Sequence, residues 1–97
     1  MIHACTLAME LHIPESSSLK GKRAVVKHVI ETSRSRFGVA AAEVSYQGKW
    51  QRSEVGFAAV SGSPGQVVEV LDAVERFVWS QPDLEVVAGS RRWLESE

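Results

Sequence analysis

The sequence predicts an α+β domain in which two helices cover one face of a four-stranded sheet. Apolar and polar residues alternate from residue 1 to 13 and again between 39 and 60, which is typical of strands with one buried face. Apolar residues recur every three or four positions from 19 to 36 and from 64 to 80, which is typical of helices. One more apolar stretch follows Pro82, so the predicted order is β-α-β-β-α-β.

The first predicted strand and helix have clear ends. Pro14 ends the strand, because proline cannot donate a ladder hydrogen bond. Ser18 is a favourable N-cap for a helix over 19–36, and Gly38 suits the left-handed position that follows a helix. The buried side of the strand is Cys5, Leu7, Met9, Leu11 and Ile13. The buried side of the helix is Leu19, Val26, Val29, Ile30, Ser33 and Phe37.

The second half repeats this logic. Residues 39–46 and 51–60 read as two strands joined by a short turn. Ser63 and Gln66 form a capping box, with Pro64 at the first helical position. The apolar side of this second helix is Val67, Val70, Leu71, Val74, Phe77 and Val78. The segment 81–83 ends the helix, and a strand over 84–94 with a bend at Gly89 completes the sheet.

Each helix has one apolar stripe, so both must cover the same face of the sheet. Right-handed crossovers then favour the split βαβ, ferredoxin-like sandwich with an antiparallel sheet. We expect a single domain over residues 1–97, because the chain is near the short end of those that fold unaided.

Composition narrows the function. No apolar run is long enough for a membrane span, and no basic and apolar leader opens the chain, so we expect a cytoplasmic protein without a membrane partner. Cys5 is the only cysteine, which excludes an intrachain disulfide and a CxxC motif. The net charge is −1, but residues 1–52 carry 8 Lys and Arg against 4 acidic residues, and residues 53–97 carry 3 against 8.

The first helix begins with cations, although acidic residues are preferred at that end of a helix dipole. Lys20, Arg23, Lys27 and Arg34 fall within about 60° of one another at 100° per residue, a stripe that can follow phosphates. The alternative is a solvated face whose long side chains cover the edge of the core. The predicted phosphate-binding or RNA-binding residues are Lys20, Lys22, Arg23, Lys27 and Arg34.

A second interpretation of these cations is structural. Glu43 lies in a strand of small apolar residues, and a carboxylate in such a setting needs a partner. We expect that Arg23 or Lys22 pairs with Glu43, across the helix–sheet layer or at its edge. Such an ion pair explains a cation near the helix start without any ligand.

The sheet face opposite the helices should present Ala4, Thr6, Ala8, Glu10 and His12 of the first strand. It lacks the central aromatic residues that an RNA-recognition sheet uses for base stacking. Small residues suit packing on another sheet, so this face is either the interface of a homodimer or an exposed face of small side chains.

Catalysis and metal binding have little support. His3 and Cys5 share a strand face without a third ligand, so we expect no metal site, no cofactor and no enzyme activity. Trp50, Trp79 and Trp93 either form contact surfaces or seal the ends of the sandwich.

The chain contains the motifs LHIP (11–14), SLKGKR (18–23), RFGVAAAEV (36–44) and WQR (50–52). In these four motifs it resembles the YlxP-like family, small bacterial proteins that form a domain of unknown function. The resemblance implies the ferredoxin-like fold. It also implies genes beside those for transcription antitermination, translation initiation and ribosome maturation.

We therefore expect a non-enzymatic accessory protein of translation or ribosome maturation. Its basic first helix would contact RNA phosphates or an acidic partner, with the small ribosomal subunit as the partner that the resemblance suggests. The alternative is a module that binds a protein or a small regulatory ligand, is dimeric through the open sheet face, and does not contact RNA.

Overall fold

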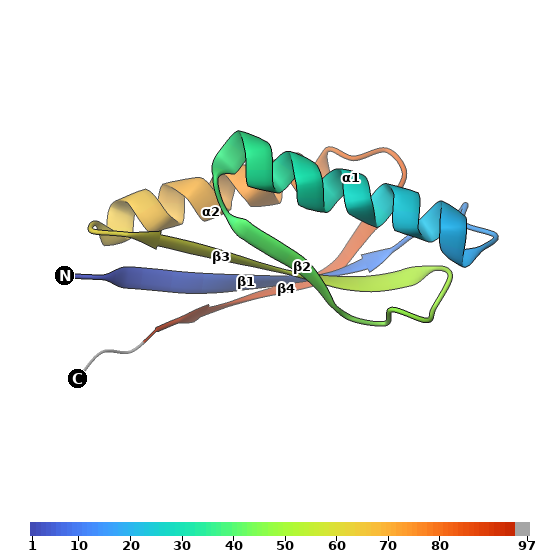
Figure 1. Ribbon diagram of the computed structural model, residues 1–97, viewed down its shortest axis with the longest axis horizontal. Coiled ribbons are helices and arrows are strands. Elements are labelled where there is room, and N and C mark those ends of the chain that lie inside the picture. Colours follow the sequence, from blue (N-terminus) through green and yellow to red (C-terminus); the bar gives the residue numbers. More distant parts are fainter. Residues whose placement is uncertain (95–97) are drawn as a thin grey trace.

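The computed structural model describes residues 1–94 of the chain. The elements follow the order β-α-β-β-α-β, as Figure 1 shows. They are β1 (His3–His12), α1 (Leu19–Phe37), β2 (Ala40–Ser45), β3 (Arg52–Ser61), α2 (Pro64–Trp79) and β4 (Glu85–Trp93). Each predicted element is present, with ends within about two residues of the expected positions.

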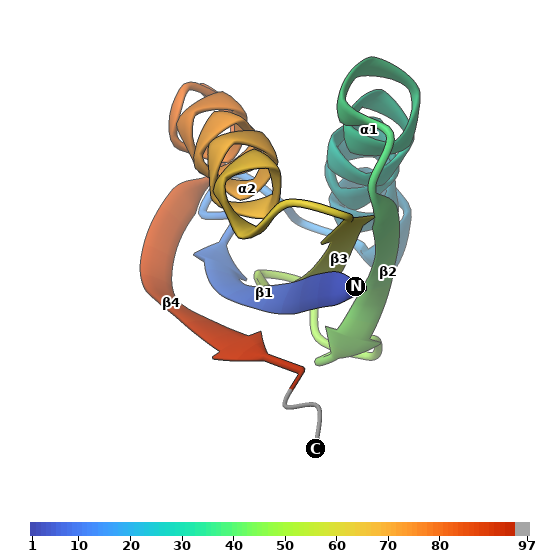
Figure 2. The ribbon, with the colours of Figure 1, turned by 90° about the vertical axis from the view of Figure 1, so that its left-hand side faces the viewer.

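The four strands form one antiparallel sheet in the order β2-β3-β1-β4. Both helices lie on the same side of this sheet, as Figure 2 shows when the molecule is viewed along its length. α1 lies on the β2 side and α2 on the β4 side. This is the ferredoxin-like α+β sandwich that the order of elements predicts.

The core lies between the helices and the sheet. All five residues predicted on the inner face of β1 are buried, and Val26 and Val29 of α1 meet them from above. The predicted apolar stripe of α2 is also confirmed, with only Val70 partly exposed. The alternation of apolar and polar residues along β1 therefore predicts which face of the sheet the helices cover.

Capping residues set both ends of α1. The Ser18 hydroxyl accepts a hydrogen bond from the Gly21 N–H at 3.1 Å. At the other end Gly38 has φ of 68°, and its N–H donates to the Arg34 carbonyl at 3.2 Å. Such a left-handed residue is readily supplied by glycine, so the chain can turn directly into β2.

β4 bends at a different place from the predicted one. The β1–β4 register shifts between Glu10, which faces Ala88, and Leu11, which faces Val86. Val87 is thus the extra residue of a bulge, two positions before Gly89. The position of Gly89 does not indicate where the strand is irregular, because the bulge depends on how β4 pairs with β1.

No helix in the described part of the chain is both long enough and apolar enough to cross a membrane.

Candidate nucleic-acid interface on the first helix

Lys22 is a core residue. Its side chain is 0% exposed, and its ammonium lies 2.7 Å from Oε2 of Glu43. The same ammonium donates to the backbone carbonyls of Tyr46 at 2.8 Å and Gln47 at 3.3 Å. All three donors of the lysine therefore have acceptors inside the protein. The prediction that Lys22 binds phosphate is wrong, because a ligand cannot reach this side chain.

The predicted ion pair with Glu43 forms through Lys22 and not through Arg23. Consecutive helix residues point about 100° apart, so when Lys22 faces the sheet, Arg23 must point outward. Arg23 is exposed, and no ion pair with it is found among residues 1–94. Glu43 also accepts a hydrogen bond from the Ser53 hydroxyl at 2.6 Å. Its carboxylate is therefore bound from both α1 and β3.

The other four predicted cations are exposed. Lys27 lies 3.9 Å from Glu31, an exposed pair that contributes little to stability. Arg34 donates to the Ala41 carbonyl at 2.6 Å, which ties the last turns of α1 to β2. Neither interaction removes the charge of the cation from the surface.

Three of these cations line one shallow groove between α1 and the edge of β2. The groove has a volume of about 400 Å³. Arg23, Lys27 and Arg34 line it together with Val26, Ile30, Glu31, Ala42 and Glu43. Because Glu43 is already bound by Lys22, Glu31 is the acidic group left to oppose three cations. We refer to these eight residues as the cationic groove.

The opposite side of the molecule is acidic. Residues 64–94 of α2 and β4 contain five acidic residues and three arginines, a net charge of −2, whereas residues 18–50 contain seven Lys and Arg and two acidic residues, a net charge of +5. α1 and α2 lie side by side over different halves of the sheet (Figure 2). The charge difference along the sequence thus becomes a charge difference across the molecule.

A second polar cluster lies near the β2–β3 turn and was not identified from the sequence. The Arg52 guanidinium stacks on the Tyr46 ring at 4.3 Å and pairs with Glu10 on β1. The hydrogen bond to Glu10 raises the pKa of Arg52 above its ordinary value. Trp50 of the same turn is 55% exposed. A strand register was needed to find this cluster, because Glu10 and Arg52 lie far apart in sequence.

Arg91 forms a third cluster on the acidic side. From β4 it donates to Asp72 at 2.7 Å and to Glu75 at 3.0 Å, both on α2. Burial lowers the pKa of Arg91, but the hydrogen bonds to the two carboxylates outweigh it, and the pKa is raised overall. This cluster was also not predicted.

The residues weighed for metal binding and catalysis are not gathered into a site. Cys5 is buried in the core, and the part of the chain described here contains no group of three metal-ligating side chains. Trp79 and Trp93 are, like Trp50, exposed rather than sealed into the sandwich.

Comparison with known proteins identifies relatives but no activity. A family model described as "Protein of unknown function (DUF503)" matches residues 4–91, which include both helices and most of the sheet. The "Uncharacterized protein YlxP" of Bacillus subtilis (strain 168) is 38% identical over 85 residues, or 88% of this chain and 92% of the relative. Neither description names a ligand, a partner or a reaction.

Proposed function

We propose that this chain, which belongs to the DUF503 family of proteins of unknown function and is YlxP-like, is a non-enzymatic accessory protein that binds an RNA backbone through its cationic groove. The small ribosomal subunit, or an intermediate in its assembly, is the proposed RNA partner. The gene neighbourhood implied by the YlxP-like resemblance suggests that partner. The contact with phosphates is argued from the side chains of α1.

The observation that carries this proposal is the convergence of Arg23, Lys27 and Arg34 on one groove. Arginine presents several N–H donors in a plane that matches phosphate oxygens, and lysine adds a mobile point charge. Lys20 extends the same side of α1 by about two turns before Lys27. From Lys20 to Arg34 the helix rises about 21 Å, enough for several consecutive phosphates.

The binding should be electrostatic and largely independent of base sequence. Four cations that each neutralise one phosphate give a slope of about −3 in a plot of log K against log salt concentration for single-stranded RNA. The uncovered sheet face offers no aromatic platform on its central strands, so base stacking there would not add specificity. Specificity for a ribosomal site would come from the shape of the folded RNA.

Co-sedimentation with purified small ribosomal subunits over a salt series tests this proposal. The variant carries Lys20→Glu, Arg23→Glu and Lys27→Glu, and leaves Arg34 in place because it also binds the Ala41 carbonyl. We expect binding that weakens with salt and is lost in the variant. Binding by both proteins alike, or by neither at low salt, would refute the RNA contact.

Arg76→Glu is the matched control for charge. Arg76 is an exposed arginine on α2, outside the cationic groove. Arg76→Glu therefore changes the net charge by the same amount as Arg23→Glu, but leaves α1 unchanged. Arg76→Glu should bind subunits nearly as well as the unmodified protein, whereas Arg23→Glu should bind clearly more weakly.

A second candidate is a protein-interaction module without RNA contact. Two of the cations have partners within the fold, since Lys27 pairs with Glu31 and Arg34 holds the Ala41 carbonyl. On this account the charges of α1 support folding and orient an acidic protein partner. Association with that protein partner would then survive nuclease treatment, whereas an RNA contact would not.

A further inference from the structure

The sheet face opposite the helices is apolar at its centre, and charged toward the end at which Glu10, Glu54 and Arg52 lie. Strand register places alanine and glycine side by side in its centre, with Ala8 opposite Gly56 and Gly56 opposite Ala42. Three larger apolar side chains stand around them, and they are strongly exposed: Val44 at 53%, Val60 at 70% and Leu94 at 66%. No helix of the described chain covers this face (Figure 2). A continuous exposed apolar face of this kind marks an interaction site more often than scattered apolar residues do.

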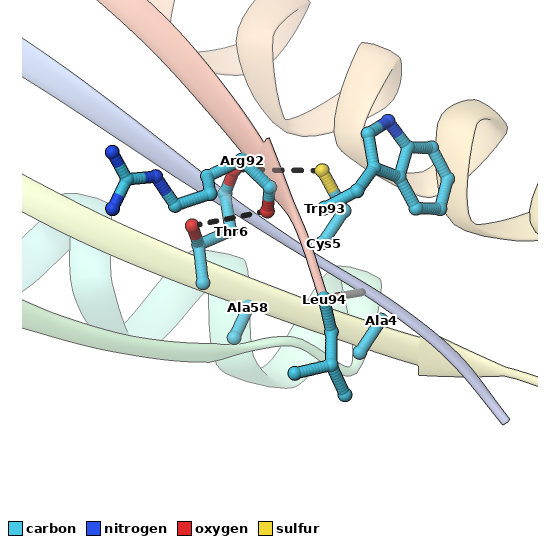
Figure 3. Close-up of a pocket in the computed structure, with 7 residues that line it drawn as sticks. All are labelled: Ala4, Cys5, Thr6, Ala58, Arg92, Trp93 and Leu94. Carbon is cyan, nitrogen blue, oxygen red and sulfur yellow. Dashed lines mark hydrogen bonds between the residues drawn. The ribbon is translucent and has the colours of Figure 1, made fainter. Parts of the chain in front are cut away.

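The open face contains two hollows. One, of about 350 Å³, lies over Ala8, Ala42 and Gly56, with Val44 beside it. The other, of about 310 Å³, lies over Ala4 and is bordered by Leu94 and Arg92. Both reach Thr6 and Ala58, so they adjoin at the centre of the face. Figure 3 shows the second hollow, with Leu94 beside Ala4 and the Thr6 hydroxyl bonded to the Arg92 carbonyl.

We propose that the open face binds a second copy of this chain and that the protein is a homodimer with the two sheets stacked face to face. In an isologous dimer both copies use the same surface, so that surface must be complementary to itself. This face supplies both halves of that fit, because its alanine and glycine floor is hollow and its Val44, Val60 and Leu94 side chains project. The projecting side chains of one copy fill the hollows of the other.

The charged residues of this face select the orientation of the two copies. Glu10 and Glu54 lie opposite each other on β1 and β3, toward one end of the face, where Arg52 pairs with Glu10, and Arg92 lies opposite Thr6 toward the other end. A two-fold axis parallel to the strands would place Glu10 of one copy over Glu54 of the other, so that four carboxylates gather around only two Arg52 guanidinium groups. An axis across the strands avoids this and brings Arg92 toward the acidic pair of the second copy. The dimer therefore has its axis across the strands.

The size of the face fits a dimer of moderate strength. The four strands are 6 to 10 residues long, and at a spacing of about 4.8 Å and about 3.4 Å per residue they cover roughly 600 Å² per copy. Stable interfaces bury about 800 Å² per partner, so this one falls somewhat short of the usual size. We expect a dissociation constant in the micromolar range. Both helices then face outward, so dimerisation and RNA binding by α1 are independent proposals.

Sedimentation equilibrium over a concentration series tests the dimer. Ala58→Glu places a charge at the centre of the face, and Leu94→Glu places one at its border in case the first variant does not fold. Each should raise the dissociation constant at least tenfold. Val68→Glu is the matched control, since Val68 is an exposed valine of α2, which lies on the other side of the sheet (Figure 2). A monomer up to about 1 mM, or a dimer that none of the open-face variants weakens, would overturn the proposal.

A charge exchange tests the orientation. Arg92→Glu should weaken the dimer, because it brings a third carboxylate toward Glu10 and Glu54. Adding Glu54→Arg to that variant should restore association, since the two charges have exchanged places across the interface. Equal dimerisation by the single and double variants would contradict the proposed axis. Far-ultraviolet circular dichroism of each variant, compared with Val68→Glu, verifies that the sheet is retained.

Discussion

Two ion-pair clusters hold the helices to the edge strands, and they are built in opposite ways. On one side the cation is on the helix and the acid on the strand, as Lys22 of α1 reaches Glu43 of β2. On the other side the cation is on the strand and the acids on the helix, as Arg91 of β4 reaches Asp72 and Glu75 of α2. The first pair is closed to solvent at its lysine, whereas the second is partly exposed at every member.

This difference distinguishes charged side chains that are needed for folding from exposed ones that can bind a ligand. A fully buried ammonium cannot be left without acceptors, because desolvation of an unpaired charge is far more costly than loss of an exposed pair. Lys22 is therefore committed to the fold. The exposed cations of α1 are under no such constraint and can bind a ligand. One helix thus carries both kinds of cation, one residue apart at Lys22 and Arg23.

The largest expected effect is that of Lys22→Met. It leaves the Glu43 carboxylate and two carbonyls of the β2–β3 turn without their donor, and it should lower the free energy of unfolding by about 3 kcal/mol. That change corresponds to a fall in Tm of more than about 10 °C for a domain of this size. Thermal unfolding followed by circular dichroism measures it.

Lys20→Met is the control for this experiment, because Lys20 is an exposed lysine of the same helix turn. It should change Tm by no more than about 2 °C, as surface substitutions usually do. An equal effect of the two substitutions would show that Lys22 is not the buried anchor described here. The double variant Lys22→Met with Glu43→Leu should recover part of the loss, since an apolar pair can replace a buried ion pair.

Glu43→Gln should have a smaller effect than Lys22→Met. The amide oxygen can still accept from the lysine or from the Ser53 hydroxyl, but the attraction between opposite charges is lost. We expect a loss of about 1–2 kcal/mol in urea unfolding, with an unchanged slope. Stability equal to that of the unmodified protein would refute a structural role for the Glu43 charge.

Arg91→Gln should have the smallest effect of the three. Its carboxylate partners are partly exposed, and exposed pairs contribute at most about 1 kcal/mol even when a guanidinium binds two acids. The loss should also decline as salt is added, because solvent-exposed charges are screened. Urea unfolding at low and high salt tests this. A loss larger than that of Glu43→Gln would invert the comparison between the two clusters.

The fold could be predicted because each element carries its own signal. Alternation in β1 showed its inner face, and Ser18 and Gly38 marked the ends of α1, all from interactions between residues close in sequence. The bulge at Val87 could not be predicted in the same way, because it depends on pairing with Glu10 and Leu11. Local sequence patterns indicate which face of an element is buried and where the element ends, whereas strand register depends on how the strands pair in the folded sheet.

The candidate site was predicted only in part, for a related reason. Helical spacing grouped four cations of α1, of which Arg23, Lys27 and Arg34 line one groove and Lys20 does not, and the lone acid in β2 correctly suggested an ion pair. Lys22 lies four and seven residues before Val26 and Val29, on the buried side of α1, and this spacing, which the prediction did not use, distinguishes it from Arg23. That distinction depends on the rotation of α1 against the sheet, which the packing of Val26 and Val29 sets. The clusters of Arg52 and Arg91 join distant segments and left no local signal.

The most direct test of the central claim compares binding of a fluorescently labelled single-stranded RNA by Arg23→Gln and by Arg76→Gln over a salt series. Both variants lose one exposed arginine from a helix, so their net charge is the same. If the exposed cations of α1 bind phosphates, Arg23→Gln weakens binding and makes the salt slope shallower by about 0.7, whereas Arg76→Gln does neither. Equal slopes for both variants and the unmodified protein would contradict the claim.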